Sequence, residues 1–464
     1  AEHARACPCH ACATPAGRPH ALRRASTGVP AADYAFEMAS STVRFGRGVT
    51  RELGMDLEAL GATSVLLVTD VGVRETPAFT RALASIDASS IRCDVYDRVR
   101  VEPTDASMLD AISFARAGSY DAYVAVGGGS AIDTAKAANL YATHAGADFL
   151  DFVNAPIGRG LPVPGPVRPL IALPTTAGTG SETTGVAIFD HEPTRAKTGI
   201  GSRLLRPTLG LIDVESMSTM PRSVAISSGL DVLCHALESF TALPYDQRTP
   251  APARPELRPA YQGSNPISDV WALSSLRAIA ESFERAVGGE PGAQEAMAVA
   301  ATCAGIGFGN AGVHLPHGMS YPVSGLNKWL PHVRYTQPGY EHVGAPIIPH
   351  GVSVAVPAPA VFRMTGPACP ERHRAAAEAL GADVSRVRSD DGEHAGAVLA
   401  ERVLALMQRL DVPLGLRALG FRDEDVPALV EGTMPQERVT KLAPRPQPVT
   451  REALECLFKD AMAY

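Results

Sequence analysis

Short apolar runs separated by helix-sized intervals are the feature that most restricts the fold of this chain. Residues 65–68, 123–126 and 170–173 have the length and apolar character of buried strands. Each run is followed by polar or glycine-rich residues, and the intervals 77–85 and 107–117 have the size of helices. Strands that alternate with helices predict βαβ units and a parallel sheet, whose ligands bind at the carboxyl ends of its strands.

The pattern changes after residue 213. Long Ala- and Leu-rich stretches of helical period follow, over residues 224–241, 269–286, 293–305 and 397–410. We therefore expect an α/β domain with a parallel sheet at residues 33–214 and an all-α domain at residues 215–464.

The composition argues against several classes of protein. The 42 Lys and Arg residues do not exceed the 49 Asp and Glu residues, so the basic excess typical of nucleic-acid binding is missing. No run approaches 18 uninterrupted apolar residues, so we expect no membrane span. Eight cysteines in 464 residues are too few for a disulfide framework and indicate a reducing compartment. The expected partners are therefore small molecules.

Residues 1–32 form a leader of different composition. The segment from residue 3 to residue 32 contains four arginines and no acidic residue, which is typical of an organellar transit peptide. We expect a mitochondrial protein, with an unstructured extension as the alternative. A third interpretation is a metal-binding tract made of His3, Cys7, Cys9, His10 and Cys12.

A glycine run follows the second predicted strand. Gly127, Gly128, Gly129 and Ser130 lead into a helical segment that contains Asp133. Glycines let the backbone approach an anion, and the free N–H groups at a helix start favour a pyrophosphate. The spacing matches neither the G-x-G-x-x-G fingerprint nor a P-loop, so a helix cap formed by Ser130 and Asp133 explains the run equally well.

A second loop, residues 174–182, gathers hydroxyl side chains and glycines after the next strand. Two such loops can enclose one extended cofactor. Asp70 ends the first strand and could accept hydrogen bonds from a ribose diol, as an acidic residue does in NAD sites. A turn carboxylate is the alternative for Asp70.

A candidate metal site lies beyond the boundary. Asp231 and His235 are four residues apart, so a helix places both on one face. His317 and His350 follow far along the chain. One carboxylate with imidazoles suits Fe(II) or Zn(II), although each histidine taken alone could be an ordinary packed residue.

Together these motifs resemble the iron-containing alcohol dehydrogenase family over residues 33–464. The resemblance rests on the two loops, the Asp231/His235 helix, His317-Gly318 and Pro349-His350-Gly351. Residues 33–38, 100–105, 261–269 and 435–444 resemble in particular its mitochondrial hydroxyacid–oxoacid transhydrogenase branch. The implied fold is the one that the family shares with dehydroquinate synthase. In it, residues 33–214 would be a Rossmann-like dinucleotide-binding domain and residues 215–464 a metal-binding catalytic domain.

The resemblance also implies the site residues, by matching position. Metal ligands would be Asp231, His235, His317 and His350, with Fe(II) preferred and Zn(II) as an alternative. Contacts to a tightly bound NAD(H) would be Asp70, Gly128, Gly129, Ser130, Asp133, Thr175, Thr176, Ser181 and Lys197. Tyr321 stands where many members have a further histidine, so its hydroxyl could take that place in catalysis, whereas His314 matches no ligand.

The implied activity is hydride transfer through bound NAD from 4-hydroxybutyrate to 2-oxoglutarate, which gives succinate semialdehyde and D-2-hydroxyglutarate. The carboxylates of such acids favour arginine partners. Two inserts, residues 244–266 and 327–349, contain four candidate arginines, Arg248, Arg254, Arg258 and Arg334. Each of them could equally be an ordinary surface residue. A homo-oligomer such as a dimer is expected. Two alternatives are an NAD-dependent alcohol dehydrogenase that uses free cofactor and a dehydroquinate synthase-like lyase, which would need a strongly basic site.

Overall fold

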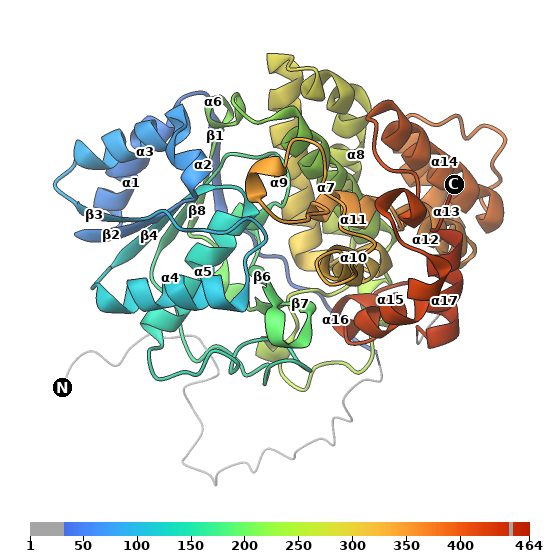
Figure 1. Ribbon diagram of the computed structural model, residues 1–464, viewed down its shortest axis with the longest axis horizontal. Coiled ribbons are helices and arrows are strands. Elements are labelled where there is room, and N and C mark those ends of the chain that lie inside the picture. Colours follow the sequence, from blue (N-terminus) through green and yellow to red (C-terminus); the bar gives the residue numbers. More distant parts are fainter. Residues whose placement is uncertain (1–31, 445–448) are drawn as a thin grey trace, which may run out of the picture.

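The structure is a computed structural model that describes residues 32–444 and 449–464 (Figure 1). The predicted leader, with its metal-binding alternative, lies outside the described residues except for Ala32.

A six-stranded parallel sheet forms the core of the N-terminal half. Its strands lie in the order β1 (Thr42–Gly46), β8 (Leu209–Asp213), β5 (Leu170–Pro174), β4 (Ala122–Gly127), β2 (Ser64–Val68) and β3 (Arg92–Tyr96). Every neighbouring pair is parallel. The strands predicted at residues 65–68, 123–126 and 170–173 are confirmed as parts of β2, β4 and β5.

Helices cover both faces of this sheet (Figure 1). One face is covered by α1 (Leu53–Ala59) and α3 (Pro77–Asp87), the other by α4 (Asp105–Ala117) and α5 (Gly129–Thr143). Along β2, Val65 and Leu67 pack toward α1 and α3, whereas Leu66 packs toward α4 and α5. Because both faces are buried, the inner strands β4 and β5 are apolar at every position instead of alternating, whereas the edge strands β1 and β3 carry charged residues.

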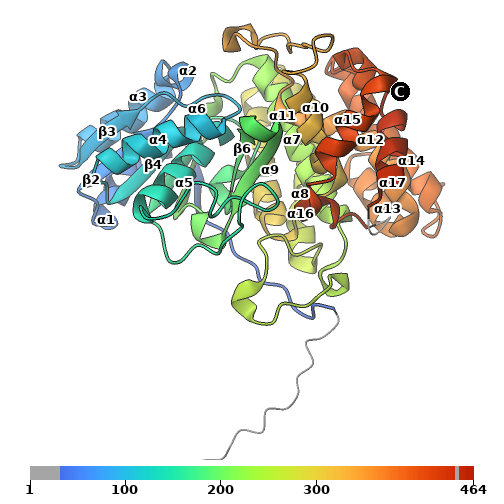
Figure 2. The ribbon, with the colours of Figure 1, turned by 60° about the horizontal axis from the view of Figure 1, so that its bottom comes forward.

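An antiparallel hairpin, which the sequence analysis did not predict, leaves this sheet before β8. It consists of β6 (Val186–His191) and β7 (Ala196–Gly201). Polar residues such as Asp190 and Lys197 interrupt its apolar pattern, and both are buried or nearly so. The hairpin contacts α5 and also α10 (Leu315–Leu326), so it lies between the two halves of the molecule (Figure 2).

After β8 every regular element among the described residues is a helix. The elements are α6 (Val214–Met217), α7 (Arg222–Thr241), α8 (Pro266–Val287), α9 (Pro291–Ala311), α10, α11 (His350–Ala355), α12 (Ala358–Thr365), α13 (Pro370–Ala379), α14 (Gly392–Arg409), α15 (Val426–Thr433), α16 (Glu437–Thr440) and α17 (Arg451–Asp460). They share one large apolar core. This order of a parallel-sheet half and a helical half confirms the predicted fold class.

No single helix among the described residues is long and apolar enough to cross a membrane. The helices α9 and α10 are long and apolar enough only when taken together, and they are bent by 104° relative to each other.

Candidate active site

The helix α7 runs through the middle of the helical half and carries two of the predicted ligands. From Ile226 onward nearly all of its residues are buried, and it packs against α8, α9 and α11. Asp231 and His235 lie one turn apart on this helix, with only 2% and 4% of their surface exposed. Carboxylate and imidazole groups are rarely buried so deeply unless they form hydrogen bonds or ion pairs or bind a metal ion.

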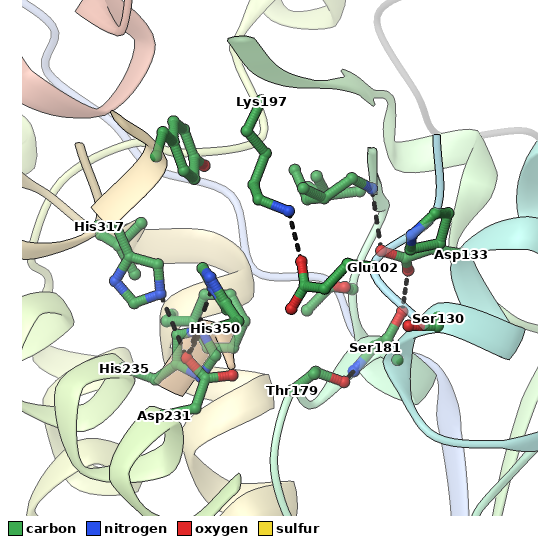
Figure 3. A pocket seen from close by; sticks show the side chains of 18 of the residues that line it. Glu102, Ser130, Asp133, Thr179, Ser181, Lys197, Asp231, His235, His317 and His350 are labelled. Carbon is green, nitrogen blue, oxygen red and sulfur yellow. Dashed lines mark hydrogen bonds and ion pairs between the residues drawn. The ribbon is translucent and has the colours of Figure 1, made fainter. Parts of the chain in front are cut away.

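The other two ligands come from separate helices. His317 lies in the first turn of α10, and His350 is the first residue of α11. The Nε2 atoms of His235, His317 and His350 lie 3.6, 3.5 and 3.7 Å from Asp231 Oδ1. Figure 3 shows the four side chains converging at one end of the cavity.

These distances fit a shared metal ion better than they fit hydrogen bonds. Ligand atoms about 2.1 Å from one tetrahedral metal lie roughly 3.4 Å from each other. Asp231 Oδ1 and His317 Nε2 are buried and have no hydrogen-bond partner among the described residues. Asp231, His235 and His317 already form a set of buried atoms that could bind one ion. The donor set therefore fits the predicted Fe(II) or Zn(II).

A glycine allows α11 to reach this set. A Cβ atom on Gly351 would lie 1.8 Å from the carbonyl oxygen of Ser227 and 3.0 Å from the backbone nitrogen of Asp231. Only glycine therefore permits this close approach of α11 to α7. The contact brings the neighbouring His350 beside Asp231.

Glu238, three residues after His235, orients the ring of His317. Its fully buried carboxylate accepts hydrogen bonds from the backbone N–H of His314, at 2.7 Å, and from His317, at 3.3 Å. It also lies 2.6 Å from His317 Nδ1. A proton held on Nδ1 by this carboxylate leaves Nε2 free to bind a metal. This role of Glu238 was not predicted from the sequence, although Asp231, His235 and Glu238 follow one another along one face of α7.

Burial and charge set the protonation of these groups. Burial lowers the pKa of His235 to about 3, so its imidazole is neutral at pH 7, as a metal ligand must be. Burial alone would also lower the pKa of His317, but the carboxylates of Glu238 and Asp231 outweigh it and raise that pKa to about 10. Burial raises the pKa of Asp231, and the three imidazoles more than reverse this effect. The site therefore attracts a cation.

His314 has a structural role. Its Nε2 lies 3.0 Å from Thr241 Oγ1, and burial lowers the pKa of its ring to about 4. It donates its backbone N–H to Glu238, so it supports the site without facing the cavity.

The two predicted cofactor loops lie side by side at the carboxyl ends of β4 and β5. Thr175 donates its backbone N–H to the carbonyl of Gly127, at 3.1 Å. A Cβ atom on Gly128 would lie 3.3 Å from Thr176 Oγ1, and one on Gly129 would lie 2.6 Å from Thr179 Cγ2. The loops therefore pack closely where the predicted pyrophosphate would bind.

Asp133 joins these loops to the hairpin. It accepts hydrogen bonds from Ser181 Oγ and from the backbone N–H of Ile188, the latter at 2.9 Å. The buried amino group of Lys136 donates to Ser181 Oγ at 2.6 Å and to the carbonyl of Val186 at 2.8 Å. The alternative of a helix cap by Ser130 and Asp133 is wrong, because the N-cap of α5 is Gly128, with no side-chain cap.

Asp70 caps α2 (Val71–Arg74) by accepting a hydrogen bond from the backbone N–H of Val73, at 2.8 Å. Its Oδ2 also lies near Gly127, 3.6 Å from the point where a Cβ would stand. It occupies the loop edge at which the resemblance places the ribose contact, and it serves as a turn carboxylate at the same time.

The predicted cofactor contacts divide into two groups. Those that line the cavity together with the metal ligands are Gly129, Ser130, Asp133, Ser181 and Lys197, whereas Asp70, Gly128, Thr175 and Thr176 stand behind it in the loops. In Figure 3 the loop residues face the ligand set across the cavity.

In Figure 3 Lys197 lies between the loop residues and the metal-ligand set, and its amino group is paired with two carboxylates. Its amino group lies 2.5 Å from Glu102 Oε2 and 2.9 Å from Asp190 Oδ1, and Asp190 also binds Lys328. Burial lowers the pKa of Lys197, but the two carboxylates outweigh it and raise that pKa above its usual range. The sequence analysis identified Lys197 but not its partner Glu102, which adopts a positive φ of 53°.

Tyr321 lines the same cavity one turn after His317. Its hydroxyl oxygen accepts a hydrogen bond from Arg438, at 3.2 Å. Two aromatic residues that the sequence analysis missed complete the wall. Phe308 stacks on His235 at 3.8 Å between ring centroids, and Tyr261 contacts Phe308 edge to face at 6.4 Å.

The four predicted carboxylate-binding arginines do not line this cavity. Arg248 and Arg258 both bind Asp33, at 2.9 Å, and so anchor the start of the described chain. The cavity itself also lacks the strongly basic surface that a dehydroquinate synthase-like lyase would need, because its lysine is paired with carboxylates.

Comparison with known proteins identifies the family of this chain. Residues 40–214 match the family model described as iron-containing alcohol dehydrogenase, and residues 260–336 and 340–462 match the C-terminal model of the same family. The chain is 55% identical over 432 residues to "Hydroxyacid-oxoacid transhydrogenase, mitochondrial" from Bos taurus and equally to that from Homo sapiens, covering 93% of this chain and 90% of each relative.

Solved structures show the same fold. The chain is similar to a 1,3-propanediol oxidoreductase at 26% identity, with a TM-score of 0.78 over 92% of this chain and 100% of the other. It is also similar to a sulfoacetaldehyde reductase from Bifidobacterium kashiwanohense in complex with NAD+, at 23% identity and a TM-score of 0.72 over 92% and 99%. The chain is thus a member of the iron-containing alcohol dehydrogenase family and an oxidoreductase that acts on CH–OH groups.

Proposed function

We propose that this chain is a hydroxyacid–oxoacid transhydrogenase. In this proposal it moves a hydride from 4-hydroxybutyrate to 2-oxoglutarate through a tightly bound NAD, and releases succinate semialdehyde and D-2-hydroxyglutarate. The observation that carries the proposal is the 55% identity to relatives of that name over 93% of the chain. One cavity is lined both by the predicted metal ligands and by residues of the glycine run, which supports the proposal.

The residues fit both cofactors. The metal, with Fe(II) preferred, would be held by Asp231, His235, His317 and His350, and NAD by the loops of β2, β4 and β5 with Lys197 beside them. When bound, the metal polarises the oxygen of the reacting carbon and the nicotinamide carries the hydride. Because one site serves both acids in turn, the cofactor need not leave between them.

The chain itself supplies orientation, exclusion of water and a hydrogen-bond donor. Glu238 orients His317, and the rings of Phe308 and Tyr261 keep the wall beside His235 apolar. The oxygen of Tyr321 accepts its hydrogen bond from Arg438, so its own O–H is left to donate into the cavity. We assign the Tyr321 hydroxyl to donate a hydrogen bond to the oxygen of the reacting carbon in both half-reactions.

We also propose a mitochondrial location. The relatives at 55% identity are named mitochondrial, and the leader has the composition of a transit peptide. The homo-oligomer stays a prediction, which light scattering of the purified protein would check.

The function is tested by following the hydride. 4-Hydroxybutyrate deuterated at its carbinol carbon is mixed with 2-oxoglutarate and the purified holoenzyme, without added nucleotide. The product 2-hydroxyglutarate should carry deuterium at C2, and excess unlabelled NADH should hardly dilute the label. Mass spectrometry measures both quantities, and Asp231→Ala is the inactive control.

The same experiment identifies the main alternative. An absolute requirement for added NAD, or deuterium lost to the free pool, would show an alcohol dehydrogenase that exchanges its cofactor. The absence of any transfer between the two acids would reject both activities on these substrates.

A further inference from the structure

We propose that Arg438 binds the distal carboxylate of both acid substrates. This inference rests on the proposed function and adds a residue that determines its specificity. Arg438 lies in α16, within the segment 435–444, and the sequence analysis gave it no role.

The two acids share one arrangement of groups. In 4-hydroxybutyrate the carbinol carbon is joined to a carboxylate through two methylene groups, and in 2-oxoglutarate the keto carbon is joined to its distal carboxylate in the same way. If the reacting carbon occupies one position in both half-reactions, a single cation at a fixed distance can bind both acids. Arginine suits this task because its planar guanidinium binds a carboxylate through two hydrogen bonds.

The lysines around the cavity are already paired. Lys197 contacts Glu102 and Asp190, and Lys136 donates to Ser181 and Val186 and lies 3.4 Å from Asp133. An anionic substrate could bind either lysine only in competition with these partners.

Arg438 is different. No carboxylate among the described residues forms an ion pair with it, and its contacts are with two tyrosines. Its guanidinium donates to the hydroxyl of Tyr321 at 3.2 Å and lies 5.2 Å from the centroid of the Tyr261 ring. A partly buried cation without a counter-ion has lost hydration and gains most from an anionic ligand.

Arg438 lies close to the cavity that holds the metal ligands, where the distal carboxylate of a bound acid could contact it. Tyr261 and Tyr321 line the cavity that holds the metal ligands, and Arg438 and Tyr261 line the cavity next to it. Arg438 lines the second cavity and not the first, but its guanidinium touches the hydroxyl of Tyr321, which lines the first. This contact with the wall of the metal-ligand cavity distinguishes it from the arginines of the inserts.

The position is rigid relative to the metal ligands. The helix α16 packs on α10, and a Cβ on Gly318, next to His317, would lie only 2.8 Å from Thr440. The same two helices thus hold His317 and Arg438, which fixes the distance between the metal site and the guanidinium.

The test measures binding of glutarate, a dicarboxylate of matching length that cannot react, to the holoenzyme by calorimetry. Arg438→Met should raise the Kd on the order of 100-fold, because a charge-assisted contact is lost. Arg438→Lys should restore binding in part, since it keeps the charge without the planar fork. Lys441→Met, three residues further in the same cavity wall, is the matched control and should leave the Kd within about twofold.

The kinetic readout separates binding from chemistry. In Arg438→Met the KM values of 4-hydroxybutyrate and 2-oxoglutarate should both rise by a larger factor than kcat falls, because the carboxylate contact is lost in both half-reactions. Circular dichroism checks folding, and Arg438→Lys carries the test if the Met variant does not fold.

Equal glutarate affinity in the wild type and in the soluble Arg438 variants would overturn the inference. A rise in KM for only one acid would overturn the shared subsite. If the wild type transfers no deuterium between the acids but binds glutarate through Arg438, the proposed function fails and the carboxylate site stands.

Discussion

At the scale of single residues, the active site depends on groups that never touch the substrate. Glu238 is the clearest case, because its carboxylate holds Nδ1 of His317 and two backbone N–H groups at the start of α10. It thereby aligns Nε2 with Asp231 and the other imidazoles. Such partners behind a metal ligand raise its basicity and fix its ring.

Replacement of Glu238 by Gln is therefore expected to weaken metal binding by roughly 10- to 100-fold while the helix stays formed. The amide keeps the shape but removes the negative charge that favours a cation next to it. Metal content after dialysis against graded chelator concentrations measures the change.

Glu182→Gln is the matched control for this variant. Glu182 is also buried, and burial raises its pKa to about 7, so an amide resembles a form that is already populated. Wild-type metal affinity in Glu238→Gln would show that His317 needs no anionic partner.

At the scale of elements, the predicted cofactor site lies where the start of α5 meets the loop after β5. The two touch through Gly129 and Thr179, where a Cβ on Gly129 would approach Thr179 Cγ2 to 2.6 Å. A side chain at residue 129 would force the loops apart or fill the space between them and the cofactor.

Gly129→Val is thus expected to raise the Kd for NAD at least about tenfold without a change in helix content. Fluorescence titration with NAD and circular dichroism measure the two properties. Gly146→Val serves as control, since no atom of another residue lies within 4 Å of the point where its Cβ would stand. An unchanged NAD affinity in Gly129→Val would move the pyrophosphate site away from this loop.

At the scale of the whole molecule, the predicted metal joins helices that are far apart in sequence. Its ligands come from α7, α10 and α11, so a bound ion stabilises the packing of the helical half as well as the reaction. A ligand that binds only the folded state at 1,000 times its Kd adds about 4 kcal/mol to the free energy of unfolding.

Removal of the metal by a chelator should therefore lower Tm by about 5 °C or more, and Fe(II) or Zn(II) should restore it. Differential scanning calorimetry records the shift. Asp231→Ala, which lacks the central ligand, should show no chelator effect. An equal shift in that variant would place the stabilising metal elsewhere in the chain.

Several features of this molecule could be predicted from the sequence because they depend on neighbours along the chain. The inner strands β2, β4 and β5 form apolar runs, since burial on both faces demands apolar residues along most of their length. The i, i+4 spacing of Asp231 and His235 places both on one side of a helix through local geometry alone. The glycine run after β4 marks a close backbone approach for the same local reason.

Other features were decided only by the tertiary structure. Glu102, Tyr261 and Arg438 approach the site through packing between elements, and no local pattern distinguishes Arg438 from the arginines of the inserts. Arg248 and Arg258 looked suited to bind a carboxylate, but in the fold their partner is Asp33. The role of a charged side chain depends on the group that it contacts. Which group that is depends on how the helices and loops pack in the tertiary structure.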